Sequence, residues 1–408
     1  MEMLHSRCAG LDVHKDLIVG SIRIQEGGVP SHELRSFGAT TSELLKLLDW
    51  LSAAGCTHVA MEATGVYWKP VWHVLEGPFE LVLANAAHIK GVPGRKSDVN
   101  DATWIADLLA HGLIRSSFVP PQEIQEVRDL TRTRSNFVRE VTRHTCRIQK
   151  LLEDCNVKLS SVLSDINGVT GRSILTAIAK GQKDPERLAD MATYNLKASR
   201  SELVESLRGR FTPHHRFMLS QELKAIEELQ KIIASIERRL GKAMEPFRAA
   251  VKRLTTIPGV SDTASKGIVA EIGLDMNRFP TDGHLVSWAC LCPSLNKTAG
   301  KNRSTRIRKG GNHLKDLLVQ CAWAAIRTKG SYLQSKYLRL KSRHGPKKAI
   351  VAIAADMLRA AYFIIRNNVE YRELGADYLQ VRDRSKIAKK LVERIKKLGF
   401  EVDLREVA

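Results

Sequence analysis

The sequence predicts an α/β domain over about residues 5–120, followed by a mainly helical remainder. Two observations predict this. Up to residue 120, apolar β-branched runs alternate with segments whose apolar residues recur at helical spacing, as in a mixed α/β domain. Beyond it, long stretches keep the heptad spacing of paired helices. With 408 residues and 43% hydrophobic content, the chain is large and apolar enough for two or three cores.

The elements of the first domain follow in order. Gly10–Ile24 is predicted as one strand, and a Glu-Gly-Gly turn leads into a second strand, His32–Phe37. The further predicted elements are the helix Ser42–Ala54, the strand His58–Glu62, a helix around Trp68–Leu75, the strand Glu80–Leu83 and a helix that starts near Asp98. An opening hairpin, later parallel strands and a last helix resemble the ribonuclease-H-like, or RuvC-like, fold.

Two long helices are predicted in the next part, residues 121–250. Residues 122–160 and Leu219–Leu240 both carry apolar side chains at heptad spacing. Such helices pair as an antiparallel hairpin or as a dimerising coiled coil. The segment between them, about residues 161–215, is polar and only weakly patterned.

A third domain is predicted over residues 251–375, with a basic tail at 376–408. Near its start, Pro258–Gly259 makes a turn before an amphipathic helix, as in a helix-hairpin-helix element that offers backbone N–H groups to phosphate. A plain packing unit is the alternative. Residues 301–350 hold fourteen Lys or Arg against one acid, Asp316. Because Gly and Ser are mixed among these charges, we expect nucleic-acid contact rather than a merely solvated face. The tail is predicted to form a basic amphipathic helix.

The bulk charge excludes several classes of protein. A formal net charge of +20 and a pI near 9.7 favour a polyanionic partner. A membrane is not expected, because no apolar run approaches the length of a spanning helix and the N-terminus lacks a signal-peptide pattern. The seven cysteines include no CxxC pair, so neither a disulfide framework nor a zinc knuckle is indicated. We therefore expect a reducing, cytoplasmic setting.

Four acids are the candidate catalytic residues. Asp12 in GLDVHKD and Glu62 in AMEATGVYW each lie at or near the end of a predicted strand, whereas Asp98 and Asp101 lie three residues apart at a predicted helix start. Carboxylates that converge in this way hold Mg²⁺ or Mn²⁺ for two-metal phosphoryl transfer. An acid at a helix start also serves as a simple N-cap, a role open here to Ser97 or Asp98. Taken together, in a basic chain, the four favour a metal site.

The opening GLDVHKDLIVGSI also looks like the first phosphate loop of sugar kinases and actin-like ATPases. Those proteins need further glycine-rich motifs for phosphate and adenosine, and the sequence contains none. The high positive charge also argues against a kinase of small metabolites.

Across nearly its full length the chain resembles the DEDD transposases of the insertion-sequence-110 type, the bridge-RNA-guided recombinases. GLDVHKD, MEATGVYW and KSDVNDA look like the three pieces of the family's acidic tetrad, and PGVSDTASKGIVAEIG like the opening of its C-terminal domain. WACLCPSLNKTAGKNRSTRIRKGGNHLK is similar to the segment that carries the family's nucleophile.

The resemblance implies a mechanism and partners. Asp12, Glu62, Asp98 and Asp101 would bind Mg²⁺, and a C-terminal serine would attack DNA to form a covalent 5′-phosphoserine link. A structured guide RNA would pair with donor and target DNA. Dimers would assemble into a tetramer whose subunits share composite sites. A prokaryotic cytoplasmic protein, associated with the nucleoid when bound, is expected.

The chain departs from the family at the nucleophile. The family serine directly precedes Ala-Gly-Lys or Gly-Gly-Lys, and here that position is Thr298. Threonine offers the same hydroxyl, although its methyl group restricts the side chain. Thr298 is the favoured nucleophile, Ser304 is the alternative, and an impaired copy is the third possibility. The residues expected to neutralise the attacked or adjacent phosphates are Lys301, Arg303, Arg306, Arg308 and Lys309.

The resulting hypothesis is a transposase that cuts and rejoins DNA by transesterification under RNA guidance. The alternative enzyme is a metal-dependent nuclease or Holliday-junction resolvase that uses the acids and water alone. A non-catalytic nucleic-acid-binding relative is the third hypothesis. A covalent protein–DNA adduct distinguishes the first from the others.

Overall fold

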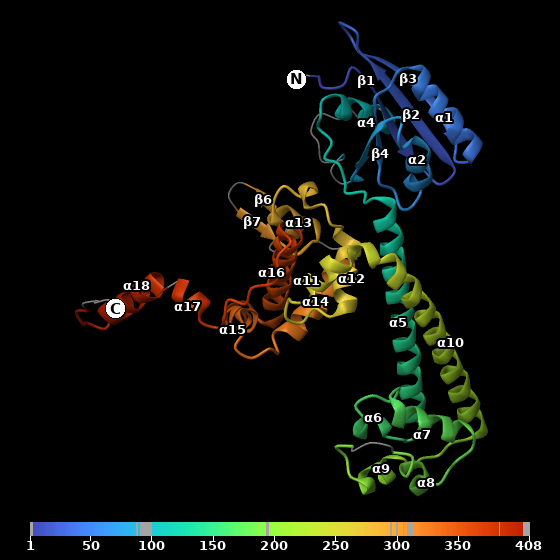
Figure 1. The fold of residues 1–408 in the computed structure, drawn as a ribbon, viewed down its shortest axis with the longest axis vertical. Helices are drawn as coiled ribbons and strands as arrows, with labels where there is room; N and C mark the ends of the chain where they lie inside the picture. Colours follow the sequence, from blue (N-terminus) through green and yellow to red (C-terminus); the bar gives the residue numbers. More distant parts are fainter. Residues whose placement is uncertain are drawn as a thin grey trace. The chain divides into compact units, whose positions relative to one another are not determined.

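The computed structural model describes residues 3–86, 89, 100–192, 196–293, 296–298, 301–304, 306–307, 313–382 and 384–402. The chain divides into two compact units, Met1–Val119 and Pro120–Ala408, and each is considered by itself (Figure 1). The first unit is mixed α/β and the second is mainly helical, as the sequence predicts. No helix within the described ranges is long and apolar enough to cross a membrane.

The first unit is built on a five-stranded sheet with the order β3-β2-β1-β4-β5. Its strands are β1 (Arg7–Val13), β2 (Leu17–Ile24), β3 (Ser31–Gly38), β4 (His58–Glu62) and β5 (Glu80–Ala84). The first three strands pair antiparallel, and β1, β4 and β5 are parallel. The prediction of one strand over Gly10–Ile24 is wrong. The exposed polar residues 14–16 reverse the chain there, so that β1 and β2 form a hairpin.

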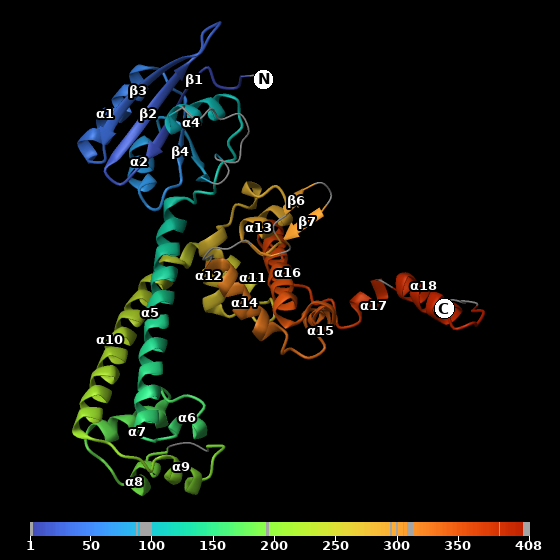
Figure 2. The ribbon, with the colours of Figure 1, turned by 180° about the vertical axis from the view of Figure 1, so that it is seen from behind.

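Helices cover both faces of this sheet (Figure 2). Their bounds are α1 (Thr41–Ala53), α2 (Trp68–Leu75) and α4 (Asp101–Ala110). One core joins α1 and α2 to alternate side chains of the strands, among them Leu11 and Met61. The second core lies on the opposite face and joins α4 to Cys8, Ala60 and Ala84. Since side chains alternate along a strand, this division shows which strand residues face α4.

The second unit begins with a long helical hairpin, α5 (Gln122–Asp154) and α10 (Pro213–Ala243). Near one end of the hairpin, Nε of Arg134 donates to Oε1 of Glu237. At the other end, Sγ of Cys155 lies 3.2 Å from Nδ1 of His215. The two helices therefore run antiparallel (Figure 1), and heptad residues of both, such as Ile148 and Ile226, share one core. Of the two arrangements predicted, the hairpin is the one formed within this chain.

A small helical domain closes the far end of the hairpin, in the segment where the sequence shows little pattern. Its helices are α6 (Leu159–Val162), α7 (Val169–Ala179), α8 (Pro185–Ala189) and α9 (Arg200–Ser206). Their buried residues, such as Leu175 and Leu203, share one core with Ile148 and Leu219 of the hairpin. These short helices gain their stability from that shared core rather than from their own pattern.

The chain continues into a C-terminal helical domain whose described residues include a small β-hairpin. Its elements are η1 (Glu245–Phe247), α11 (Arg248–Leu254), α12 (Asp262–Ile272), η2 (Met276–Arg278), α13 (Asp282–Trp288), β6 (Asn296–Thr298), β7 (Lys301–Ser304), α14 (His313–Ala325), α15 (Tyr332–His344), α16 (Pro346–Asn367), α17 (Tyr378–Arg382) and α18 (Arg384–Lys396). The long helix α16 is central and packs against α11, α13, α14 and α15. The amphipathic helix predicted for the tail is formed by α18.

Candidate active site

Asp12 and Glu62 lie side by side at the carboxyl ends of two neighbouring parallel strands. The pairing of β1 with β4 brings Leu11 opposite Met61, and the acids are the next residue on each strand. Leu11 and Met61 belong to the core under α1 and α2, so the alternation of side chains turns Asp12 and Glu62 to the face covered by α4. Two of the four predicted acids are thereby brought to one edge and one face of the sheet.

The helix α4 brings a third acid to the same edge, because it runs antiparallel to β1. The amide of Leu4 donates to the carbonyl of Ala110 at one end of α4, and a Cβ built on Gly10 would lie 2.3 Å from the Ala102 carbonyl oxygen at the other. Only glycine allows this approach. Asp101, the first residue of α4, precedes that contact and therefore lies toward the end of β1 that carries Asp12.

Local contacts help to orient these acids. The side chain of Asp12 is 18% exposed, and its Oδ2 lies 3.1 Å from Nε2 of His14. The Thr64 hydroxyl donates to Oε1 of Glu62 over 3.4 Å. Both partners follow their acid by two residues, and the sequence reasoning missed them. The motifs DVH and EAT are the only signal that could have revealed them.

The cap of α4 differs from the sequence expectation. Asn100 is the N-cap, and its side chain accepts from the amide of Ala102, so neither Ser97 nor Asp98 has that role in the described helix. Asp98 itself lies outside the described residues. Over the ranges that the structure describes, no group of three Asp, Glu, His or Cys side chains is close enough to hold a metal ion. The arrangement thus comprises two acids in register and a third at the adjoining helix start.

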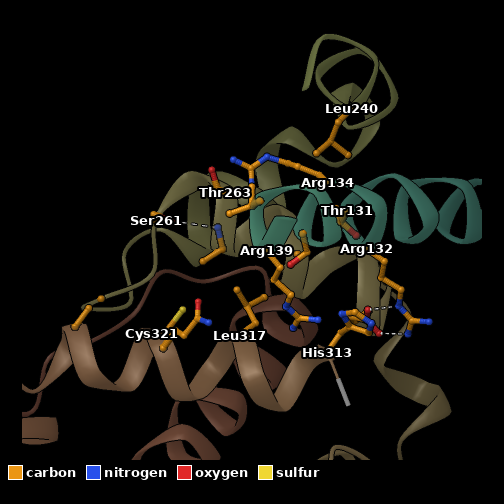
Figure 3. Close-up of a pocket in the computed structure, with 18 of the residues that line it drawn as sticks. Thr131, Arg132, Arg134, Arg139, Leu240, Ser261, Thr263, His313, Leu317 and Cys321 are labelled. Atoms are coloured by element: carbon orange, nitrogen blue, oxygen red, sulfur yellow. Dashed lines mark hydrogen bonds and ion pairs between the residues drawn. The ribbon is translucent and has the colours of Figure 1, made fainter. Parts of the chain in front are cut away.

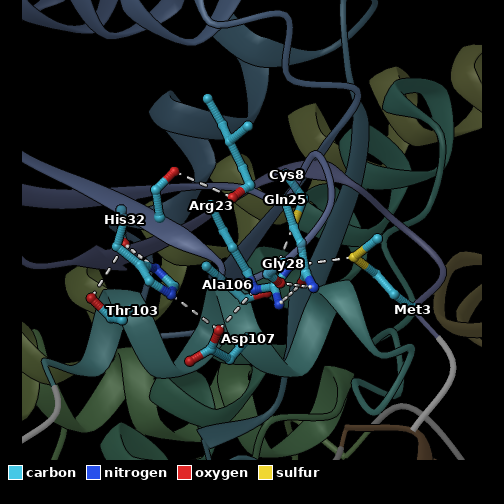
Figure 4. Close-up of polar contacts among 12 residues, drawn as sticks. Met3, Cys8, Arg23, Gln25, Gly28, His32, Thr103, Ala106 and Asp107 are labelled. Carbon is cyan, nitrogen blue, oxygen red and sulfur yellow. Dashed lines mark hydrogen bonds and ion pairs between the residues drawn. The ribbon is translucent and has the colours of Figure 1, made fainter.

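Asp107, a further acid of the first unit, has a structural role on α4 (Figure 4). Its Oδ1 accepts from Arg23 on β2 over 3.0 Å and lies 3.3 Å from Nε2 of His32 on β3. Burial raises the pKa of Asp107, but the hydrogen bonds and charges of His32 and Arg23 outweigh it and hold that pKa below its usual value. The carboxylate ties α4 to the sheet and so fixes the helix that begins with Asp101.

The candidate nucleophile lies in the second unit, on the short hairpin of β6 and β7. Thr298 is the last residue of β6, and its backbone pairs with that of Lys301, while Ser304 pairs with Asn296. Arg306 is exposed just after this hairpin. Arg303 lies within β7, whereas Arg308 and Lys309 are outside the described residues.

A buried ion pair, which the sequence reasoning missed, joins α5 to α12. The Glu271 side chain is only 5% exposed and accepts two bonds of 2.8 Å from Arg132. Arg128 adds bonds to the backbone carbonyls of Ala270 and Glu271. An acid inside the apolar helix GIVAEIG was the available signal, but its partners are about 140 residues away.

Comparison with known proteins finds transposase families that match two parts of the chain. A family model described as a transposase, of the DEDD type of IS110, matches residues 9–157. The model of the IS116/IS110/IS902 transposase family matches residues 251–338. The first match spans Asp12, Glu62 and Asp101, and the second spans Thr298 and the basic segment.

Curated relatives give the same result over most of the chain. A probable family 20 transposase of Pseudomonas aeruginosa is 26% identical over 321 residues, which are 77% of this chain and 85% of the relative. The transposase for insertion sequence element IS1111A of Coxiella burnetii is 25% identical over 78% of this chain and 79% of the relative. An uncharacterized 43.6 kDa protein of insertion element IS110 from Streptomyces coelicolor is 24% identical over 68% of this chain. The chain belongs to the IS110 family of DEDD transposases, which are DNA-processing enzymes.

Proposed function

We propose that this transposase cuts and rejoins DNA by transesterification through a covalent protein–DNA intermediate, under the guidance of a structured RNA. The observation that carries the proposal is the placement of Asp12 and Glu62 in register on β1 and β4, on the face against which α4 begins with Asp101. Strand ends and a helix start that deliver acids to one edge support a RuvC-like catalytic domain over residues 5–120.

Asp12, Glu62, Asp98 and Asp101 would hold the divalent metal on which DEDD transposase domains generally depend. Their carboxylate oxygens are hard donors and fit Mg²⁺ or Mn²⁺ rather than a softer ion. A bound ion would supply Lewis-acid stabilisation to the reacting phosphate. The acids themselves orient the site, and the contacts of His14 and Thr64 restrain two of them before any ion binds.

The hydroxyl of Thr298 is the proposed nucleophile. Its oxygen forms a bond to the phosphorus of the scissile phosphodiester while the bond from phosphorus to the 3′-oxygen breaks. The proton lost by the hydroxyl is balanced by the one gained at the departing 3′-oxygen, which leaves a 3′-hydroxyl and a 5′-phosphothreonine. Attack by another strand's 3′-hydroxyl reverses these bonds and releases Thr298. Ser304 is the alternative hydroxyl.

The remaining segments have proposed roles in binding and assembly. Lys301, Arg303, Arg306, Arg308 and Lys309 would neutralise DNA phosphates around the nucleophile, which agrees with the net charge of +20. The helical segment 121–250 would join subunits, and the domain 251–375 would deliver Thr298 to the acids of another subunit in a tetramer. The RNA would select donor and target DNA by base pairing.

A covalent adduct tests the chemistry. The purified full-length protein is incubated with RNA transcribed from the non-coding end of its element, Mg²⁺ and a labelled DNA junction, then denatured and separated by size. We expect an adduct that is lost in both Asp12→Asn and Thr298→Ala, because each removes one half of the composite site. Thr298→Ser restores the family residue and should increase the adduct.

The controls separate the competing functions. Ser304→Ala should leave the adduct unchanged, whereas an adduct that persists in Thr298→Ala and disappears in Ser304→Ala reassigns the nucleophile. Cleavage with no adduct in any variant indicates the hydrolytic nuclease. An adduct that forms equally well without RNA contradicts RNA guidance.

A further inference from the structure

A groove of about 560 Å³ lies within the second unit, between α5, α12 and α14 (Figure 3). Its walls include several hydroxyl side chains, among them Thr131 and Ser135 of α5 and Thr263 of α12. Its size is that of a ligand site, and these polar side chains lie beside apolar ones such as Val138 and Leu317. Among the described lining residues, His313 is the one with an aromatic ring.

Three arginines line the groove, and each of them also has an acidic partner. Glu271 is the one acid among the described lining residues, and Arg134 is bonded to Glu237 of α10. Arg132 is committed to Glu271, as described above. Arg139 and its acidic partner Asp316 are 3.7 Å apart and about half exposed, so this pair is weak and can be exchanged for a stronger anionic partner. A phosphate group is such a partner.

The start of α12 adds neutral donors to the same wall. The Ser261 side chain caps the helix by accepting from the amide of Ala264, while the amides of Asp262 and Thr263 lie in the first turn, where the helix provides no acceptor. Ser261 and Thr263 both line the groove. The carboxylate of Asp262 is balanced by Lys266, 2.7 Å away. Anions are favoured at such a helix start.

His313 marks the other end of the groove. Burial lowers the pKa of His313, and the nearby charges of Arg132 and Arg139 lower it further, although Glu271 and Asp316 oppose them. This lowered pKa favours the uncharged ring, so the positive charge at the groove comes from the arginines. His313 is also the first residue of α14, and in the sequence it follows closely on the basic segment 301–309.

We propose that the groove binds the sugar-phosphate backbone of a nucleic-acid strand without reading its bases. Arginines, hydroxyl groups and helix amides are the donors that position backbone phosphates. Stacking of bases needs aromatic platforms, and within the described part of the lining His313 alone offers a ring. The strand can be DNA or the guide RNA, which share this backbone. The inference rests on the proposed function only in requiring a nucleic-acid partner.

Two substitutions test the groove by fluorescence anisotropy with labelled DNA and RNA oligonucleotides of several sequences. Thr263→Glu places a negative charge in the groove, but it suits the first turn of a helix and should leave the melting temperature unchanged or raised. We expect binding to weaken about tenfold. Arg139→Gln should weaken binding equally for all sequences and lower the salt dependence by about one phosphate contact.

Matched variants outside the groove serve as controls. His214→Glu adds the same charge to the first turn of α10, and Arg143→Gln removes an exposed charge from α5. Both should bind nearly as the unmodified protein does. Equal losses in test and control variants would show that binding follows total charge, and losses that depend on base sequence would contradict backbone recognition. Either result overturns the proposal.

The measurement is made in the Asp12→Asn background, so its outcome does not depend on catalysis. A loss confined to RNA or to DNA supports the groove and identifies the strand that it holds. If the protein binds nucleic acid and the groove variants bind as well as their controls, the groove proposal alone fails. If the protein binds neither DNA nor RNA, both the groove and the proposed function fail.

Discussion

Replacing Glu271 by glutamine removes the charge that joins the hairpin helix α5 to α12. In the intact protein its carboxylate accepts two bonds from Arg132 and lies 3.8 Å from Nε of Arg128. The side chains of Glu271 and Arg128 are only 5% and 13% exposed, so water cannot replace the lost partner at that end. The variant retains the shape of the side chain but leaves buried positive charge uncompensated.

The magnitude follows from the burial of the three groups. Breaking a buried ion pair costs about 3–5 kcal/mol. Arg132 is 40% exposed and can be partly rehydrated, and Arg128 keeps its two carbonyl acceptors. The lower end of that range, about 3 kcal/mol, is therefore expected for the contact between α5 and α12. That energy corresponds to roughly a 100-fold increase in local opening.

Hydrogen exchange of the full-length protein, followed by mass spectrometry, measures this opening directly. Peptides from α12 should exchange roughly 100-fold faster in Glu271→Gln, because exchange reports the free energy of local opening. Glu140→Gln is the matched control, since it removes an acid from an exposed pair with Arg143 on α5. Such pairs contribute about 0–1 kcal/mol. Equal exchange in the two variants would refute the assigned role of Glu271.

Three further predictions concern other parts of the fold. Asp107→Asn should lower the melting temperature above about pH 4, because a carboxyl with a lowered pKa stabilises the fold only while it is ionised. The difference in melting temperature from the unmodified protein should shrink as the pH falls below 4. A difference that persists at low pH contradicts this prediction. Gly10→Ala should destabilise the first unit by about 3 kcal/mol through its clash with Ala102, whereas Gly241→Ala, with open space around it, should stabilise by about 0.5–1 kcal/mol; denaturant titration compares them. Ser331→Ala removes the cap of α15 and should cost about 1 kcal/mol, seen as faster hydrogen exchange in that helix.

Strong periodicity made several elements predictable from sequence. The strand His58–Glu62 and the helix Trp68–Leu75 are confirmed at both ends, because their apolar patterns coincide with the buried faces. The reversal inside Gly10–Ile24 was not predicted, because the residues on both sides of it are mostly apolar. Only the short polar run at residues 14–16 marks this reversal of the chain. The domain at the end of the hairpin was missed because its helices are short and their burial depends on partners in α5 and α10.

The candidate site was likewise predictable from the sequence only in part. The motifs around Asp12 and Glu62 predicted strand-end acids, and the register of β1 and β4 brings the two together. The assignment of metal and nucleophile remains a prediction. The bonds from Arg132 to Glu271 could not be predicted, because no local spacing encodes a pair separated by 139 residues. Long-range polar pairs depend on how helices cross, which a single sequence does not reveal.

The antiparallel course of α5 and α10 has a consequence for how such chains can vary. The two helices contain 33 and 31 residues, so each extends roughly 45–50 Å. Because α10 runs antiparallel to α5, whole turns can be removed from both helices while the first residues of α5 and the last residues of α10 stay next to each other. Changes in step by a heptad would also preserve the packing between them. The length of the hairpin can therefore vary, and matched deletions in its two helices would yield a series of proteins that differ in the distance between the two ends of the hairpin.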